Sequence, residues 1–371
     1  MADAMTLVRE DPRRRNLLIL GAVTSLFLIL ALVAVFQQSR ALAPKFAQRP
    51  FFPGLADRIN NLGEITIASK TGTFHIKLNQ GQWVVVERDS FPADVAQVRS
   101  LAAGMADLTA LEPRTGRGDM LTFLGLSAPD QGGDAIEVKL ADMSGQSLAD
   151  VLVGHAQGTA DELGRTNVFV RRPNEMQAWL ARGALAPKAT IGDWLDKGVV
   201  NIARDRVKGA TVTPPMGPGY NLLRENKDQA DFKMTDIPAG RSLSFEGSPD
   251  GVAGAIVGFA FDDIAKADQF NFMGAPQSVF HTFDGLDITA KIATKGMEHW
   301  ASISAAGQNP MTEMEAMRIN ARVGGWALKL PEMKMEQIVA TRETLLRPLD
   351  TPTPTAARAA TPRPATTAPG R

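Results

Sequence analysis

Residues Ile65 to Leu108, which read ITIASKTGTFHIKLNQGQWVVVERDSFPADVAQVRSLAAGMADL, carry the clearest pattern of secondary structure in the chain. Up to Val85, apolar residues alternate with polar ones, which is typical of half-buried strands. Lys70-Thr71-Gly72 and Asn79-Gln80-Gly81-Gln82 interrupt the alternation and predict turns. After Phe91-Pro92 the apolar residues recur at helical spacing instead. The stretch therefore predicts a three-stranded meander followed by an amphipathic helix.

A second stretch with the same order of elements begins at Val207. Short alternating runs extend to Met234, and Ile237-Pro238 precedes an apolar helical stretch through Val252, Ile256 and Phe259. The two stretches share little sequence identity, so the prediction of an internal duplication rests on pattern alone.

Further alternating runs follow each copy and predict more strands. Asp284-Gly285 between two such runs is a strong hairpin signal. From Met311 to Leu346 the sequence predicts a helix, a break at Gly324-Gly325, a short strand and a final helix. Antiparallel meanders with segregated helices are typical of an α+β fold rather than of parallel βαβ winding.

The N-terminal region contains an uncharged run, LLILGAVTSLFLILALVAVF, from Leu17 to Phe36. About 20 apolar residues suffice to cross a bilayer as a helix, so we expect a transmembrane helix at residues 17–36, in contact with the lipid bilayer. Arginines at positions 9 and 13–15 precede it, which favours a cytoplasmic N-terminus and a periplasmic C-terminal domain in the inner membrane. The opposite orientation stays open.

A cleaved signal peptide is the alternative interpretation of this run. Ala41-Leu42-Ala43 resembles a cleavage site. The apolar run is longer than the roughly 7–15 residues of a signal peptide, and Pro44 would directly follow the cut, so we favour the anchor.

The chain is expected to be organised around this anchor in six segments. These are a cytoplasmic N-terminus (1–16), the transmembrane helix (17–36), a juxtamembrane spacer (37–54), a first α+β unit (55–206), a second α+β unit (207–346) and a disordered tail (347–371). The spacer prediction rests on prolines, which stiffen a chain. The tail is rich in Pro, Thr and Ala and has too little apolar surface to offset its ordering entropy.

Composition excludes several classes of function. The chain has 40 Lys plus Arg and 40 Asp plus Glu, so it has no excess positive charge to bind nucleic acid. It has no cysteine, which excludes disulfides, thiolate nucleophiles and iron–sulfur clusters.

The stretch from Ile65 to Thr115, the Asp193-Trp194-Leu195-Asp196 segment and the closing Gly325-Trp326 and Leu330-Pro331 resemble a bacterial family called domain of unknown function 4340. The resemblance extends from about Leu62 to Leu346. It implies a single-span envelope protein without an assigned activity, encoded in many cases beside ABC transporter components similar to those of gliding-motility systems. A partner among ABC transporter subunits is therefore expected.

Recognisable catalytic motifs are lacking. The sequence contains no G-x-G-x-x-G after a strand, no H-E-x-x-H and no G-x-S-x-G elbow. Histidines 75, 155, 281 and 299 are scattered, and we expect them on the solvated surface rather than in a metal site. Asp262-Asp263 is expected to be a solvated cap. We therefore predict no enzyme, no cofactor and no metal.

The tryptophans offer the remaining candidates for contact with a ligand or partner. All five are expected to pack in the core, and the alternative is an exposed aromatic platform. Trp179 and Trp194 fit that alternative best, because they flank a loop. The sequence thus favours a non-enzymatic interaction domain with protein partners in the envelope. A periplasmic module that binds a small molecule or polysaccharide, in a cleft between the repeats, is the second hypothesis, and an enzyme the third.

Overall fold

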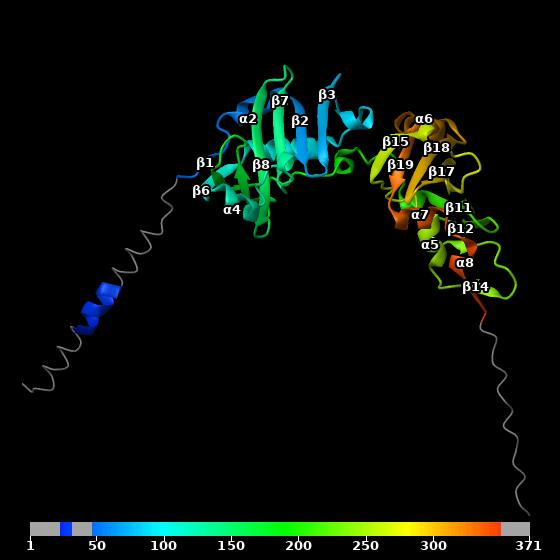
Figure 1. The fold of residues 1–371 in the computed structure, drawn as a ribbon. Helices are drawn as coiled ribbons and strands as arrows, with labels where there is room; N and C mark the ends of the chain where they lie inside the picture. The colour runs from blue at the N-terminus through cyan, green and yellow to red at the C-terminus, as the bar shows by residue number, and fades with distance from the viewer. Residues whose placement is uncertain (1–22, 32–46, 350–371) are drawn as a thin grey trace, which may run out of the picture. The chain divides into compact units, whose positions relative to one another are not determined.

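The computed structural model describes residues 23–31 and 47–349, and it divides the chain into two compact units (Figure 1). Of the described residues, unit 1 contains those up to Leu78 together with Ala96–Ala189. Unit 2 contains Asn79–Val95 together with the described residues from Thr190 onward. Both units combine antiparallel sheets with helices, so the predicted α+β class is confirmed.

The strands of unit 1 form an antiparallel sheet in the order β1-β6-β10-β9-β8-β7-β2-β3. Figure 1 shows β8, β7, β2 and β3 side by side. The bounds are β1 (Arg49–Pro50), β2 (Leu62–Ser69), β3 (Gly72–Asn79), β6 (Thr109–Pro113), β7 (Ile136–Asp142), β8 (Ser147–Gln157), β9 (Thr166–Arg171) and β10 (Ala178–Gly183). The three predicted meander strands match β2, β3 and β4 (Gln82–Val85), and the predicted helix matches α3 (Val95–Ala106).

Helix α3 approaches the chain near Ala184 very closely. A Cβ on Gly104 would lie 2.2 Å from the Ala184 carbonyl oxygen, so only glycine fits at this position. Val98, Leu101 and Met105 on this helix are buried. The unit also contains the short helices α2 (Leu55–Arg58), α4 (Gly118–Leu121), η1 (Ile59–Asn61), η3 (Thr122–Leu124) and η4 (Pro129–Gln131).

Unit 2 contains a second antiparallel sheet, in the order β13-β12-β11-β16-β17-β18-β19-β15. The bounds are β11 (Val207–Thr213), β12 (Tyr220–Leu223), β13 (Lys233–Met234), β15 (Asp263–Lys266), β16 (Gln277–Thr282), β17 (Leu286–Lys295), β18 (Glu298–Gly307) and β19 (Trp326–Leu330). Strand β4 pairs antiparallel with β5 (Phe91–Pro92). Strands β14 (Arg241–Leu243) and β20 (Leu346–Pro348) form a separate two-stranded sheet. The predicted Asp284-Gly285 hairpin lies between β16 and β17.

The two units repeat one strand order. The order β3-β2-β7-β8-β9-β10-β6 in unit 1 has the same connectivity as β12-β11-β16-β17-β18-β19-β15 in unit 2. Both units also shift register at the same place, between Leu62 and Glu64 on β2 and between Val207 and Gly209 on β11. A repeated order with a shared bulge is what the predicted duplication requires.

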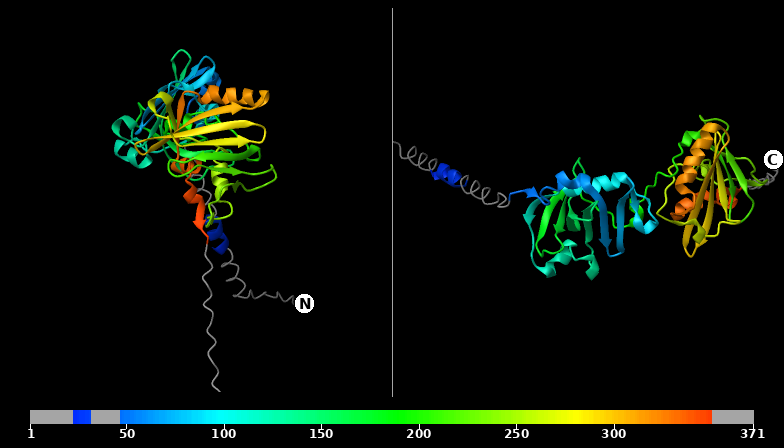
Figure 2. Two further views of the ribbon diagram at one scale, coloured as in Figure 1. Left: turned by 90° about the vertical axis from the view of Figure 1, so that its right-hand side faces the viewer. Right: turned by 90° about the horizontal axis from the view of Figure 1, so that it is seen from above.

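The helices of unit 2 cover one face of its sheet. Helix α6 (Pro310–Val323) packs mainly on β18 through Ala316, Ile319 and Val323, which are buried (Figure 2). Tyr220 and Ser278 bond to the carbonyl oxygens of Ala340 and Ile338 beside α7 (Glu332–Ile338). The strands place Ala210, Val212, Phe280, Ile288 and Ile303 in the core.

The boundary between the units lies at residue 190, whereas the sequence suggested residue 207. The segment η5 (Ile191–Trp194) belongs to unit 2, because the Asp94 amide donates to the Trp194 carbonyl oxygen and Ala93 forms a bridge with Leu195. The remaining short helices of unit 2 are η2 (Val86–Arg88), α5 (Ser248–Ala253), η6 (Arg204–Arg206), η7 (Ala267–Gln269) and α8 (Arg342–Leu345).

The spacer predicted at residues 37–54 is wrong in its last part. Arg49 and Pro50 form β1, which pairs with β6, and Phe51 is only 3% exposed. An edge strand tolerates Pro50, because its missing N–H need not bond to a neighbour. The folded region thus begins before Leu55.

Three other predictions, of the bounds of two helices and of the C-terminal tail, are also wrong. The helix predicted through Phe259 ends at Ala253, and Gly258 takes a positive φ of 55°, which fits the low helix propensity of glycine. The predicted final helix is divided into α7 and α8. The tail predicted as disordered from residue 347 is wrong for Arg347 and Pro348, which pair with β14; residues 350–371 lie outside the described residues.

Most of the predicted transmembrane segment also lies outside the described residues. Residues 23–31 are helical, and their large apolar side chains are between 43% and 67% exposed. Among the described residues, no helix has both the length and the apolar character needed to span a membrane.

Candidate functional site

The face of the unit 2 sheet opposite its helices carries a group of converging polar side chains. Side chains alternate along a strand, so Thr211 lies between the buried Ala210 and Val212 and points to the other face. His281 likewise follows the buried Phe280. His281 is paired directly with Asp287 across β16 and β17. Three adjacent strands thus bring Thr211, His281 and Asp287 together.

These three side chains are joined by hydrogen bonds through the histidine ring. The Nδ1 atom of His281 lies 2.8 Å from Oδ1 of Asp287, and its Nε2 atom lies 3.1 Å from Oγ1 of Thr211. The side chains of His281 and Asp287 are 38% and 27% exposed. Because a carboxylate only accepts hydrogen bonds, the Nδ1 atom must carry the proton.

Proton placement on the other ring nitrogen determines the direction of the remaining bonds. In a neutral imidazole with a protonated Nδ1, the Nε2 atom is an acceptor, and Thr211 donates to it. In the imidazolium, Nε2 donates to Thr211, whose hydroxyl then donates to Oδ1 of Asn221, 2.8 Å away. In the neutral state the single hydroxyl proton of Thr211 serves either Nε2 of His281 or Oδ1 of Asn221, so the hydroxyl bonds to both only when the ring is an imidazolium.

Gln308 completes the group from the other side. Its Nε2 atom donates to Oδ2 of Asp287 at 3.1 Å, and its backbone amide donates to the Gly285 carbonyl oxygen at 2.8 Å. Both oxygens of Asp287 are thus engaged, which fixes the orientation of the carboxylate.

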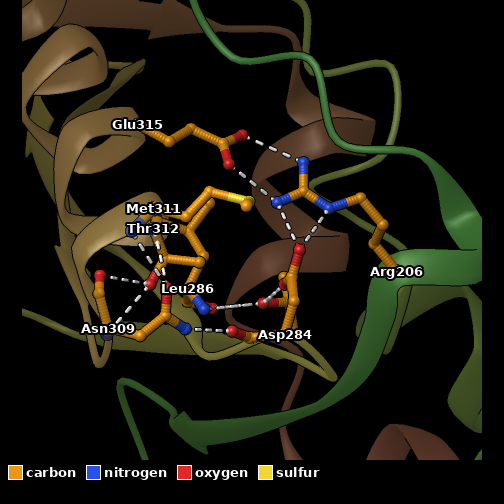
Figure 3. A network of polar contacts seen from close by, with 8 residues as sticks. Arg206, Asp284, Leu286, Asn309, Met311, Thr312 and Glu315 are labelled. Atoms are coloured by element: carbon orange, nitrogen blue, oxygen red, sulfur yellow. Dashed lines mark hydrogen bonds and ion pairs between the residues drawn. The ribbon is translucent and has the colours of Figure 1, made fainter.

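A second network holds the loop that carries Gln308 (Figure 3). Asn309 caps helix α6 by accepting from the amides of Met311 and Thr312, and its Nδ2 atom donates to the Asp284 carbonyl oxygen at 2.7 Å. A cap of this kind typically contributes about 1 kcal/mol to stability. It therefore ties the start of α6 to the β16–β17 turn.

Arg206 strengthens this junction with two carboxylates. Its guanidinium donates to both oxygens of Glu315 at 2.9 and 2.8 Å, and to Asp284 at 3.0 Å (Figure 3). Burial alone would raise the pKa of Asp284, but the bond from Thr282 and the charge of Arg206 hold it below its ordinary value. The Glu315 bonds raise the pKa of Arg206, so this junction stays charged at neutral pH.

The polar group lines a recess of about 340 Å³. Besides the residues above, the exposed Lys208 and the apolar Leu223 and Phe283 contribute to its walls. One face of the Phe283 ring lies against Arg224, whose Cζ atom is 5.5 Å from the ring centroid. The recess thus combines fixed polar groups with an apolar side, the usual composition of a small-molecule site.

The two tryptophans predicted to contact a ligand or partner lie elsewhere. Trp194 is 1% exposed, which fits the core packing expected for the tryptophans and not the alternative of an exposed platform. Trp179 lies on β10 in unit 1, half-buried, with Arg49 5.7 Å from its ring centroid. Neither residue lines the recess of unit 2.

Two other sequence expectations need correction. His281 is not a simply solvated residue, because both of its ring nitrogens bond to side chains. Asp263 does not cap a helix but begins β15, where both of its oxygens accept from Arg88 at 2.5 and 2.6 Å. The signal for His281 was present in the period-2 pattern, which places His281 opposite Asp287 across the Asp284-Gly285 turn.

Unit 2 has two further concave surfaces. A recess of about 590 Å³ adjoins Arg88 and Asp263, but its Phe270 and Trp300 rings pack on each other at 4.7 Å, and Trp300 is only 7% exposed. An apolar groove of about 550 Å³ lies beside α5, α7 and α8, where Phe245 and Met333 are 66% and 72% exposed.

Metal binding has no support in the part of the chain that the structure describes. There, no three residues among His, Asp and Glu are grouped in a way that could hold an ion. The pair of His281 and Asp287 supplies two ligands at most.

Residues 83–244 match a family model described as Domain of unknown function (DUF4340). The resemblance stated from the sequence is confirmed over these residues. The match includes Thr211 and Asn221 but ends before His281 and Asp287. No curated protein and no solved structure matches the chain.

Proposed function

Since residues 83–244 of this chain belong to the DUF4340 family of domains of unknown function, we propose that it is a single-pass, membrane-anchored envelope protein. Residues 17–36 would cross the inner membrane, and the two α+β units would lie in the periplasm. There they would bind protein partners without catalysis, as an accessory component of an ABC-type transport system.

The observation that carries the proposal is the uncharged run from Leu17 to Phe36. Its described part, residues 23–31, is a helix with apolar side chains exposed all around it. A helix that is apolar on every side is stable when protein or lipid surrounds it. The arginines before the run support the proposed orientation.

The surface that we assign to a protein partner is the apolar groove of unit 2. Contiguous exposed apolar surface typically marks an interaction site, and flexible methionines such as Met333 adapt to a partner's shape. Of the groove-lining residues, Glu336 alone is charged. We therefore expect the occupant to be an apolar segment of another envelope protein.

Copurification from mild detergent tests this proposal. The full chain should enrich ABC transporter subunits above a control, and Met333→Glu should abolish this enrichment. Met297→Glu is the matched control, because Met297 is 94% exposed and does not line the groove. Enrichment of no envelope protein, or equal enrichment by both variants, would contradict the proposal.

Reporter fusions test the orientation separately. Alkaline phosphatase fused after residue 349 should be active, since it works only outside the cytoplasm. An active cytoplasmic reporter at the same position would contradict the proposed topology.

A second candidate function is favoured by the recess around His281. This is a module that binds a small molecule or polysaccharide in the periplasm. The sequence placed such a cleft between the repeats, whereas the recess lies within unit 2.

A further inference from the structure

We propose that the recess formed by Thr211, Asn221, His281, Asp287 and Gln308 binds a neutral sugar through adjacent hydroxyl groups. This inference rests on the second candidate function above and gives its ligand class.

The side chains that bound the recess keep unused donors and acceptors. When Asn221 accepts from Thr211, its amide nitrogen keeps two protons that can be donated. Gln308 uses one amide proton on Asp287, and its own Oε1 can still accept. A sugar hydroxyl both donates and accepts. Two amides on opposite sides of the recess therefore match a pair of hydroxyls on one ring.

The charge of the recess disfavours ions. Asp287 is paired with His281 and bonded by Gln308, and Lys208 is the one other charged side chain that lines the recess. Phosphate and carboxylate sites typically use an arginine fork or several cations. An uncharged ligand is thus the better match.

The size and walls of the recess also fit a sugar. Its volume of about 340 Å³ lies near the lower end of the roughly 300–1,000 Å³ of small-molecule sites. That volume suits one or two sugar rings. Leu223 and Phe283 provide an apolar wall against which the C–H face of a ring can pack.

The recess is rigid enough to bind a weakly interacting ligand. Thr211, Asn221, His281 and Asp287 lie on β11, β12, β16 and β17, which pair in that order. The loop of Gln308 is held by the Asn309 cap and the Arg206 junction (Figure 3). Preorganised groups bind with less loss of conformational entropy.

Saturation-transfer NMR on the full chain in detergent micelles tests the inference. The probes are glucose, galactose, mannose and N-acetylglucosamine, with cyclohexanol as a six-membered ring that has a single hydroxyl. We expect transfer to at least one sugar and none to cyclohexanol, because a single hydroxyl cannot satisfy both amides. Thr211→Val and Asn221→Ala should each weaken binding of that sugar roughly tenfold or more.

Thr66→Val is the matched control, since Thr66 occupies the position of Thr211 in unit 1, and it should leave binding unchanged. If a sugar binds equally well to all variants, the site inference is wrong, although the second candidate function survives. If no sugar shows transfer, the sugar inference is wrong, whereas a module for another small molecule is not contradicted, and the protein-partner proposal still stands on its own copurification test.

Discussion

The two units have the same strand order, yet their open sheet faces carry different chemistry. The strand registers, counted from the shared bulge, align the outward-facing residues of the two units. Thr66 of unit 1 corresponds to Thr211 of unit 2. In the same way, Ala141 corresponds to His281, and Ser147 corresponds to Asp287. Unit 1 thus lacks the histidine and carboxylate of unit 2. The buried positions are therefore required by the fold, while the outward positions are free to acquire a function.

Unit 1 has its own polar group on this face, built from other positions. Lys139 lies 3.0 Å from Glu137 and 3.8 Å from Asp150. Among the described residues, nothing bonds to the buried Oδ1 atom of Asp150. Burial raises the pKa of Asp150 to about 6, against the opposing charge of Lys139. This face therefore contains a buried carboxylate oxygen without a partner in the described part of the chain, whereas both oxygens of Asp287 on the open face of unit 2 are bonded.

Substitutions at core positions that the two units share should give the largest losses of unfolding free energy. Leu140 and Phe280 occupy corresponding buried positions, 0% and 1% exposed. We expect Leu140→Ala to cost about 2–5 kcal/mol and Phe280→Ala about 3–5 kcal/mol of unfolding free energy, because each leaves a cavity. Hydrogen exchange should rise in the sheet of the mutated unit. Losses below about 1 kcal/mol in either variant would contradict the equivalence of the two cores.

The next largest loss of stability is expected at the Arg206 junction, whose ion pairs have no counterpart at the corresponding residue of unit 1. Asn61 is the counterpart of Arg206 in unit 1. The carbonyl oxygen of Arg206 accepts from the Phe283 amide, and that of Asn61 accepts from the Met143 amide. Of the two, only Arg206 also bonds to two carboxylates, those of Asp284 and Glu315. Arg206→Met leaves Glu315 and Asp284 without that partner, so we expect a loss of about 1–2 kcal/mol in chemical denaturation.

The control for this prediction is Asn61→Ala. It removes no comparable ion pair and should change the unfolding free energy by less than about 0.5 kcal/mol. Equal effects of the two substitutions would show that the junction does not distinguish unit 2 from unit 1.

The smallest effect concerns Asp150 and depends on pH. A raised folded-state pKa means that the folded state binds the proton more tightly than the unfolded state. Stability therefore falls as pH rises from about 4 to about 6, and remains lower above that range. Asp150→Asn should remove this fall and stabilise the protein by about 1 kcal/mol at pH 7, after allowance for solvent screening. Denaturation at pH 4 and pH 7 checks this, and an equal change at both pH values would contradict it.

Much of the fold was predictable from periodicity. The β2 and β3 strands, helix α3, the β16–β17 hairpin and helix α6 all carry apolar residues at the spacing of their element. The short strands β6 and β15 were missed, because four or five residues give too little pattern. Strand β1 was missed because its proline suggested a spacer.

The candidate site was less predictable than the fold. The sequence places His281 opposite Asp287 across a turn, but Thr211 is 70 positions away from His281 along the chain. The contact between them depends on β11 pairing with β16, a long-range register that spacing does not reveal. Conversely, Trp194 was a candidate contact residue because it flanks a loop in the sequence, yet its ring is buried.

The proton of His281 gives the most direct test of the difference between the units. Long-range ¹H–¹⁵N NMR of the full chain at pH 8 reports which nitrogen of each of the four histidines is protonated. His281, assigned by its loss in His281→Gln, should have its proton on Nδ1, because Asp287 accepts from that atom. A proton on Nε2 of His281, with Nδ1 free, would contradict the arrangement that distinguishes unit 2.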